Sequence, residues 1–147
     1  MRGLGLGTAP LRVLCLGAHP DDIEIGCGGA LMTLHRRADT SVSGVVLTGT
    51  AERGREACDS LPRFVPGARV DVLGLPDGRL PAHWEEVKQA LEDVASRGPV
   101  DVIFAPRPDD AHQDHRLLGK LATTVWRDHL ILHYEIPKWD GDLATPS

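Results

Sequence analysis

The sequence predicts an α/β fold in which helices cover both faces of a mostly parallel sheet of about five strands. Two observations support this prediction. Short apolar or β-branched runs alternate along the chain with longer segments of helical spacing, which is the pattern of βαβ units. The 147 residues are 41% hydrophobic and 25% charged, a composition typical of one ordinary globular domain.

The first half of the chain contains two strand–helix units. Residues 11–17 form a short, mostly apolar run that predicts a strand, and residues 28–37 have the apolar spacing of a helix. Residues 42–48 are β-branched and bounded by glycines, which predicts a second strand. The charged segment 52–61 is compatible with a helix, which we expect to end at Pro62.

The second half repeats the alternation. Residues 69–73 alternate as a strand does, and Pro76-Asp77-Gly78 predicts a turn. Residues 84–95 carry an apolar helical face. Residues 100–105 form an almost continuous apolar run, typical of a buried parallel strand. A further amphipathic helix opens near His112.

A fifth strand, predicted over residues 130–136, completes a Rossmann-like three-layer sandwich with right-handed crossovers. We expect residues 1–10 to form a flexible N-terminal leader and residues 11–147 a single domain. The apolar stretch that follows the leader is too short for a signal peptide, so we expect a cytoplasmic protein.

Charge and cysteine content exclude several classes of function. The formal net charge of -5 and the absence of a basic stripe argue against nucleic acid as a partner. Nothing in the composition indicates a membrane protein. The three cysteines are widely spaced without a C-x-x-C pair, so we expect small buried side chains and no disulfide framework or thiolate zinc site. A homo-oligomer is compatible with the sequence.

Two clusters of histidine and aspartate follow the first and fourth predicted strands. Ala18-His19-Pro20-Asp21-Asp22 comes after residues 11–17, and a cluster that ends in His112-Gln113-Asp114-His115 comes after residues 100–105. Ligands of open α/β sheets bind in a crevice at the carboxyl ends of the strands, so we expect the two clusters to share one crevice. Histidine and carboxylate are ligands of divalent metals such as zinc.

The spacing within the clusters indicates a catalytic rather than a structural metal site. A turn through Pro20 can present His19 and Asp22 to the same point, which leaves Asp21 suited to act as a general base. The alternative is that the two aspartates only cap the following helix. In the second cluster, His112 and His115 lie three residues apart and face the same side of a helix start. Spacing alone does not decide which of the two binds the metal.

Gly26-Cys27-Gly28-Gly29 raises the alternative of a nucleotide-binding Rossmann domain, because dinucleotide-binding loops lie between a strand and a helix. The spacing is G-x-G-G and not G-x-G-x-x-G. Asp21, Asp22 and Glu24 would also repel a pyrophosphate at this helix end. We expect instead that the glycines let the helix approach the sheet closely and leave room for a ligand over the metal.

Both motifs resemble the signatures of one enzyme family. The segment from Ala18 to Glu24, the following Gly26-Cys27-Gly28-Gly29 and the later His112-Gln113-Asp114-His115 are similar to those of the PIG-L/LmbE-like N-deacetylases. The resemblance extends over about residues 11–142. It implies a zinc-dependent hydrolase that removes the N-acetyl group from an N-acetylglucosamine-type conjugate, a small-molecule substrate, and releases acetate and a free amine.

The resemblance also implies roles for individual residues. His19, Asp22 and His115 would hold one Zn²⁺ per chain, with Fe²⁺ or another divalent ion as an alternative. Asp21 would be the general base, and His112 would stabilise the oxyanion and protonate the leaving amine.

Further residues have less specific signals. Arg53-Gly54-Arg55-Glu56 matches the family's R-x-x-E pattern, which implies that Arg53 contributes to the sugar site; the alternative is a solvent-facing helix start. We expect Asp114 to orient His19 or His115, as carboxylates often do for ligating histidines, and Asp109 or Asp110 could do the same. We interpret Asp77 first as a turn residue.

The chain departs from the family in two places. Asp110 stands where some thiol-biosynthesis members carry a tyrosine that helps the tetrahedral intermediate. The family also usually continues past the fifth strand, so the resemblance implies a domain that lacks the usual C-terminal segment and has a more open site. A metal- or sugar-binding module of the same fold without efficient catalysis is therefore a second functional hypothesis.

Overall fold

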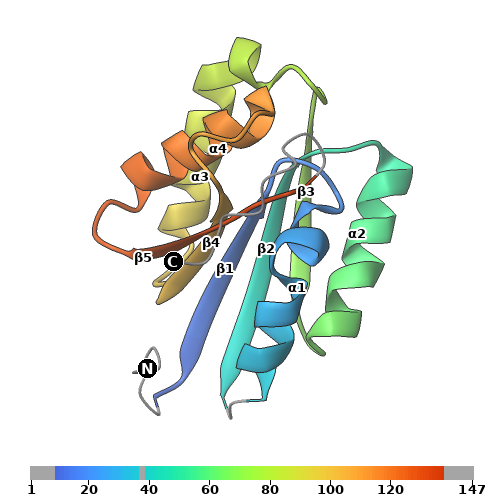
Figure 1. Ribbon diagram of the computed structural model, residues 1–147, viewed down its shortest axis with the longest axis vertical. Coiled ribbons are helices and arrows are strands. Elements are labelled where there is room, and N and C mark those ends of the chain that lie inside the picture. The colour runs from blue at the N-terminus through green and yellow to red at the C-terminus, as the bar shows by residue number, and fades with distance from the viewer. Residues whose placement is uncertain (1–8, 37–38, 138–147) are drawn as a thin grey trace.

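The computed structural model describes residues 9–36 and 39–137, which form an α/β sandwich (Figure 1). Strands and helices alternate along the described part of the chain, as the sequence predicts. In chain order the elements are β1 (Leu11–Gly17), α1 (Asp22–His35), β2 (Thr40–Thr48), α2 (Ala51–Phe64), β3 (Arg69–Leu75), the 3₁₀ helix η1 (Leu80–His83), α3 (Trp84–Ser96), β4 (Val102–Pro106), α4 (Gln113–Val125) and β5 (Leu130–Tyr134).

The five strands form one sheet in the order β3-β2-β1-β4-β5, and each neighbouring pair is parallel. β1 lies at the centre, between β2 and β4. The strand order reverses at β1 and β4, which is the switch point where open α/β sheets bind ligands. The α/β fold and the strand count predicted from the sequence are confirmed.

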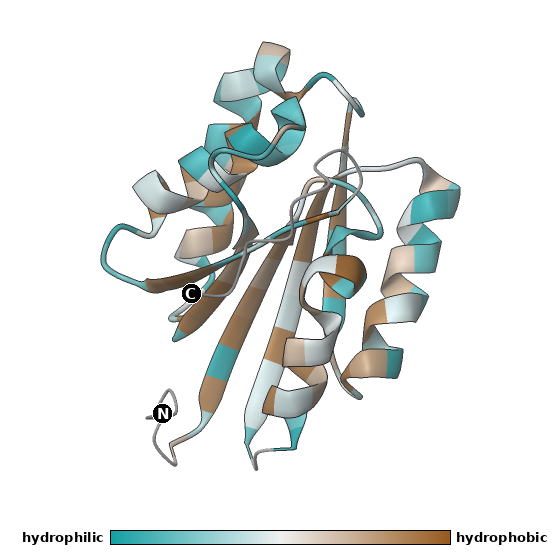
Figure 2. Cartoon of the chain, in the orientation of Figure 1, coloured by the Kyte–Doolittle hydropathy of each residue, from teal (hydrophilic) through white to brown (hydrophobic). Residues whose placement is uncertain are grey.

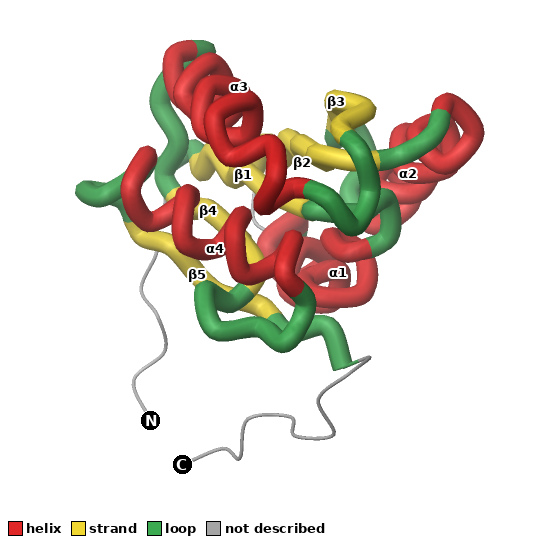
Figure 3. Tube along the Cα trace, turned by 90° about the horizontal axis from the view of Figure 1, so that it is seen from above, coloured by secondary structure: helices red, strands yellow, loops and turns green. Residues whose placement is uncertain are grey.

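Helices cover both faces of the sheet, as Figure 3 shows from above. On one face α3 and α4 pack on a core that includes Leu16 and Ile103, and on the other face α1 and α2 pack on a core that includes Cys15 and Ile23. β4 is buried throughout and β1 almost throughout. Burial on both faces explains why these two strands read as nearly continuous apolar runs (Figure 2).

Helix α1 differs from the prediction. It begins at Asp22 and not at residue 28, so the glycine segment lies inside the helix. A Cβ atom on Gly26 would overlap the ring of Tyr134, and one on Gly28 would contact the ring of Phe64, whereas Gly29 faces open space. The expectation that these glycines leave room for a ligand is therefore wrong, because two of them admit aromatic rings. No loop is present there to hold a pyrophosphate.

Helix α2 also extends further than predicted, because it continues past Pro62 to Phe64. Proline removes one hydrogen-bond donor, but only the last turn loses that bond, and Val65 N still donates to the Leu61 carbonyl at 3.0 Å. Of the three cysteines, Cys15 and Cys27 are buried as predicted, whereas Cys58 is exposed.

The predicted leader over residues 1–10 lies almost wholly outside the described residues, and so does the end of the chain after residue 137. The assignment of residues 11–147 to one domain therefore stays a prediction. Within the described ranges, no helix is both long and apolar enough to cross a membrane.

Candidate metal centre and active site

The loops after β1 and β4 meet in one crevice, as expected from the switch-point rule. Residues from both loops line a cavity of about 980 Å³, together with residues that follow β2, β3 and β5. The turn after β1 is held from β2, where the Thr48 hydroxyl donates to the Ala18 carbonyl at 2.7 Å. His19 therefore leaves the sheet at a fixed point and faces the histidines of the second cluster.

Three candidate ligand atoms form a nearly equilateral triangle. His19 Nδ1 lies 3.1 Å from His115 Nε2 and 3.4 Å from Asp22 Oδ2, and the last two atoms are 3.2 Å apart. A tetrahedral ion bound at about 2.1 Å separates two of its ligand atoms by about 3.4 Å. Both the spacing and the chemistry of these two imidazoles and one carboxylate thus fit a zinc-type ion.

Asp22 is fixed by the backbone rather than by a helix cap. Its Oδ2 accepts hydrogen bonds from Ala18 N at 2.9 Å and His19 N at 2.8 Å. Burial alone would raise the pKa of this carboxyl, but hydrogen bonds and charge from His115 and His19 outweigh burial and hold the pKa far below its ordinary value. Asp22 is thus ionised although it is only 2% exposed.

The outer nitrogens of the two rings are also near carboxylates. His19 Nε2 lies 3.1 Å from Asp77 Oδ1 and 3.4 Å from Asp114 Oδ2, while His115 Nδ1 lies 3.3 Å from Asp110 Oδ1. Both nitrogens are buried, and neither meets an acceptor in good hydrogen-bond geometry.

Burial lowers the pKa of His19 and of His115, but the carboxylates around them outweigh burial and raise both above the ordinary value. The pair is thus surrounded by negative charge.

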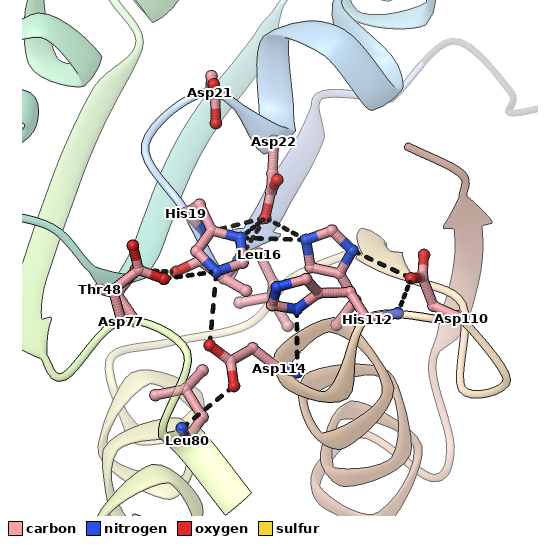
Figure 4. A network of polar contacts seen from close by, with 12 residues as sticks. Leu16, His19, Asp21, Asp22, Thr48, Asp77, Leu80, Asp110, His112 and Asp114 are labelled. Atoms are coloured by element: carbon pink, nitrogen blue, oxygen red, sulfur yellow. Dashed lines mark hydrogen bonds and ion pairs between the residues drawn. The ribbon is translucent and has the colours of Figure 1, made fainter. Parts of the chain in front are cut away.

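His112 lies at the N-terminus of α4 (Figure 4), and its ring centroid is 4.8 Å from that of His19 and 4.8 Å from that of His115. Its Nδ1 accepts a hydrogen bond from Asp114 N at 3.2 Å. Because a backbone N–H only donates, the neutral ring carries its proton on Nε2. Burial, followed by the charges of His19 and His115, lowers the pKa of His112.

The three histidines form another candidate ligand group, because one ring nitrogen of each lies within 4.8 Å of those of the other two. The triangle that contains Asp22 is tighter, and His112 already uses Nδ1 as a helix cap.

Asp21 and Arg53 form an ion pair at the edge of the cavity. Asp21 Oδ2 lies 3.2 Å from Arg53 Nη2, and both side chains are about half exposed, at 55% and 50%. Asp21 makes no side-chain cap to α1 and lies apart from the ring cluster in Figure 4, with no contact drawn between them. Arg53 also lies 3.6 Å from Glu56, its partner in the R-x-x-E pattern. Arg53 thus lines the crevice from the first turn of α2, with its side chain half exposed.

Asp114 connects the histidine cluster to the loop after β3. It is fully buried, and its two oxygens accept hydrogen bonds from Gly78 N at 2.8 Å and Leu80 N at 3.1 Å. This anchoring brings Asp77 beside His19. Asp77 thus lies in the turn that the sequence predicts and also contacts His19 at the crevice.

An open parallel sheet with a histidine–aspartate cluster at its switch point defines the class, an α/β protein with a candidate metal-binding crevice. Residues 14–126 match the model of the PIG-L family, described as GlcNAc-PI de-N-acetylase. The chain therefore belongs to the PIG-L family. The uncharacterized deacetylase YaiS of Escherichia coli is 30% identical over 138 residues, which cover 85% of this chain and 74% of that protein.

Solved structures agree with this family. N,N'-diacetylchitobiose deacetylase from Pyrococcus horikoshii matches with a TM-score of 0.63 and 29% identity, over 78% of this chain and 48% of that one. The protein TT1542 from Thermus thermophilus matches with a TM-score of 0.61 and 30% identity, over 83% and 60%. The chain thus spans about half of the first of these proteins and 60% of the second. The hydratase GalB from Pseudomonas putida, at 22% identity and a TM-score of 0.65, shares the fold.

Proposed function

We propose that this chain is a zinc-dependent N-deacetylase that acts on an N-acetylglucosamine-type conjugate and releases acetate and a free amine. The observation that carries the proposal is the triangle of His19 Nδ1, Asp22 Oδ2 and His115 Nε2, with sides of 3.1 to 3.4 Å. The family match and the similarity to a chitobiose deacetylase support the reaction and the amino-sugar substrate class.

In this proposal His19, Asp22 and His115 hold the ion, and Fe²⁺ is an alternative to Zn²⁺ because both accept imidazole and carboxylate. Bound zinc supplies Lewis acidity, which polarises the acetamide carbonyl and lowers the pKa of water. Asp114 supports His19 from the buried side, at 3.4 Å from its Nε2.

Two residues move protons in the proposed reaction. Asp21 takes a proton from the attacking water, and its ion pair with Arg53 fixes its carboxylate at the cavity edge. His112 donates a hydrogen bond from Nε2 to the oxygen that gains charge. Its charged form, with a proton on Nδ1 in place of the bond from Asp114 N, gives the Nε2 proton to the departing nitrogen and leaves a neutral ring. Since the cap to Asp114 N fixes the proton on Nε2, the neutral ring is already a donor to that oxygen.

Arg53 is the proposed sugar contact. It lines the cavity together with Thr50 and Asp77, and hydroxyl groups of a sugar suit such donors and acceptors. A cavity of about 980 Å³ is large enough for a small-molecule conjugate.

Metal analysis and a product assay test the proposal together. The purified protein is treated with a chelator, reloaded with zinc and assayed for acetate and amine release from N-acetylglucosamine and N,N'-diacetylchitobiose. We expect zinc to restore activity in the parent protein and in the exposed-histidine control His35→Ala, but not in His115→Ala. Equal activity of folded His115→Ala and the parent would contradict the assignment.

A metal- or sugar-binding module without efficient catalysis remains the second candidate. It is favoured by one observation, since the Asp21 carboxylate is paired with Arg53 and contacts none of the three rings in Figure 4. Stoichiometric zinc binding by the parent protein without amine release from any N-acetyl sugar of a small panel would support this candidate over the deacetylase.

A further inference from the structure

A single carboxylate oxygen of Asp110 lies beside both histidines of the second cluster, His112 and His115. Its Oδ1 accepts a hydrogen bond from the backbone N–H of His112 at 2.8 Å and lies 3.3 Å from Nδ1 of His115. The side chain is only 10% exposed. This carboxylate therefore acts inside the cluster and not on the surface, unlike its neighbour Asp109.

The position of Asp110 is itself held from the following helix. Arg116, in the first turn of α4, donates from Nη1 to the carbonyl of Asp110 at 2.6 Å and also contacts the carbonyl of Ala111. Asp110 N lies 3.4 Å from the Arg107 carbonyl, which closes the turn. Backbone and side chain of Asp110 thus have defined partners, so its carboxylate has little freedom to move away from His115.

The proton on His115 depends on this carboxylate. His115 Nε2 belongs to the ligand triangle and must present a lone pair to a cation, so its proton must lie on Nδ1. Nδ1 is buried, and the carboxylate oxygen that lies beside it is Oδ1 of Asp110. Asp22 Oδ2 lies 3.2 Å from Nε2 and competes for the proton while no cation is bound. Once a cation takes the Nε2 lone pair, the Asp110 charge at 3.3 Å stabilises the proton on Nδ1, and a carboxylate behind a ligating histidine raises the basicity of the ligating nitrogen.

We propose that Asp110 is a positioning residue whose carboxylate fixes the proton on Nδ1 of His115 and, through the backbone of His112, the turn that carries the proposed proton donor. This inference deepens the proposed function and rests on it, because His115 is a ligand only if the chain binds a metal. Asp110 touches neither the substrate nor the ion in this role.

The variant Asp110→Asn tests the role of the charge. The asparagine amide oxygen can still accept from His112 N, while the negative charge beside His115 is lost. We expect Asp110→Asn to fold, to bind Zn²⁺ about 10-fold or more weakly in a chelator competition, and to change the absorption spectrum of the Co²⁺-substituted protein. The control Asp109→Asn removes the adjacent carboxylate, which is 66% exposed and paired with Arg107, and should match the parent in both measurements.

A folded Asp110→Asn protein with parental zinc affinity and cobalt spectrum would overturn the inference. A parent protein that binds no zinc would instead overturn the proposed function. If Asp110→Asn fails to fold, the Nδ1–H of His115 is measured in the zinc-loaded parent by ¹H–¹⁵N NMR of labelled histidine. A downfield-shifted proton that exchanges slowly with solvent supports the inference, and a proton in the ordinary range that exchanges rapidly contradicts it.

Discussion

His19 Nδ1 and His115 Nε2 lie 3.1 Å apart, although 96 residues separate them in the chain. The two rings meet because each follows the end of a central strand, and β1 and β4 are neighbours in the sheet. Two ring nitrogens at this distance cannot both point protons at each other. At least one lone pair therefore faces the partner ring and Asp22, which is the arrangement that a cation stabilises.

The metal-free protein should be most stable in mildly acidic solution. The lowered pKa of Asp22 gives stability that is present above the ordinary value of 3.8 and is lost as the pH falls toward the folded-state value. The raised pKa values of His19 and His115 give stability that is present below the ordinary value of 6.5 and is lost as the pH rises through their folded-state values. The lowered pKa of His112 has the opposite effect on stability, but it involves one ring, whereas the raised pKa values involve two.

Urea unfolding of chelator-treated protein across this range measures the effect, and we expect a maximum between the two ordinary values. Bound zinc should prevent the loss of stability at higher pH, because its ligands bind in their deprotonated forms. A metal-free stability that rises steadily from about pH 6 to about pH 8 would contradict the assignment of the charges.

Alanine at the neighbouring positions Asp21 and Asp22 should have different effects on the free energy of unfolding. Asp22→Ala removes the acceptor of two backbone N–H groups and should lower the free energy of unfolding by about 1–3 kcal/mol. Asp21→Ala removes an exposed side chain without a cap and should change it by less than about 0.5 kcal/mol, while deacetylation falls about 100-fold or more. Chemical denaturation and the product assay separate the two, and equal destabilisation by both would disagree with the structure.

Two glycines of α1 should differ in their tolerance of alanine. Gly26→Ala forces a methyl group against the ring of Tyr134, whose hydroxyl donates to the Leu16 carbonyl at 2.6 Å beside the site. We expect a loss of about 1–3 kcal/mol. Gly29→Ala meets open space and should add about 0.5–1 kcal/mol, since alanine loses less backbone entropy in a helix. Thermal unfolding decides, and a stable Gly26→Ala protein would count against this packing.

Arg53→Ala should affect substrate use more than folding. The side chain is half exposed, so its ion pair with Asp21 adds little stability. Loss of a charged hydrogen bond to the sugar should raise KM about 10-fold or more, and loss of the Asp21 partner should lower kcat. The control Arg55→Ala changes an exposed arginine that does not line the cavity. Its steady-state KM and kcat should equal those of the parent protein. Parallel losses in both variants would speak against a specific contact.

The strands and their alternation with helices could be predicted because β1 and β4 are buried on both faces and read as apolar runs. The start of α1 could not be predicted, because glycines weaken a helix locally. The reason for Gly26 and Gly28 lies in the rings of Tyr134 and Phe64, which are distant in sequence. The candidate ligands could be predicted from strand ends. The contact of Asp77 with His19 could not, and the sequence left open whether Asp109 or Asp110 lies beside a histidine. Both contacts depend on loops that Asp114 and Arg116 anchor from α4.

The strand order has one further consequence. β1 leads into α1 on one face of the sheet, and β4 leads into α4 on the other face. An ion held by His19, Asp22 and His115 would therefore cross-link the two helical layers at the carboxyl edge of the sheet. It would close a loop of almost a hundred residues, as a disulfide bond does. Metal loading would then slow amide hydrogen exchange at the starts of both helices together, a coupling of opposite faces that runs through the site and not through the sheet.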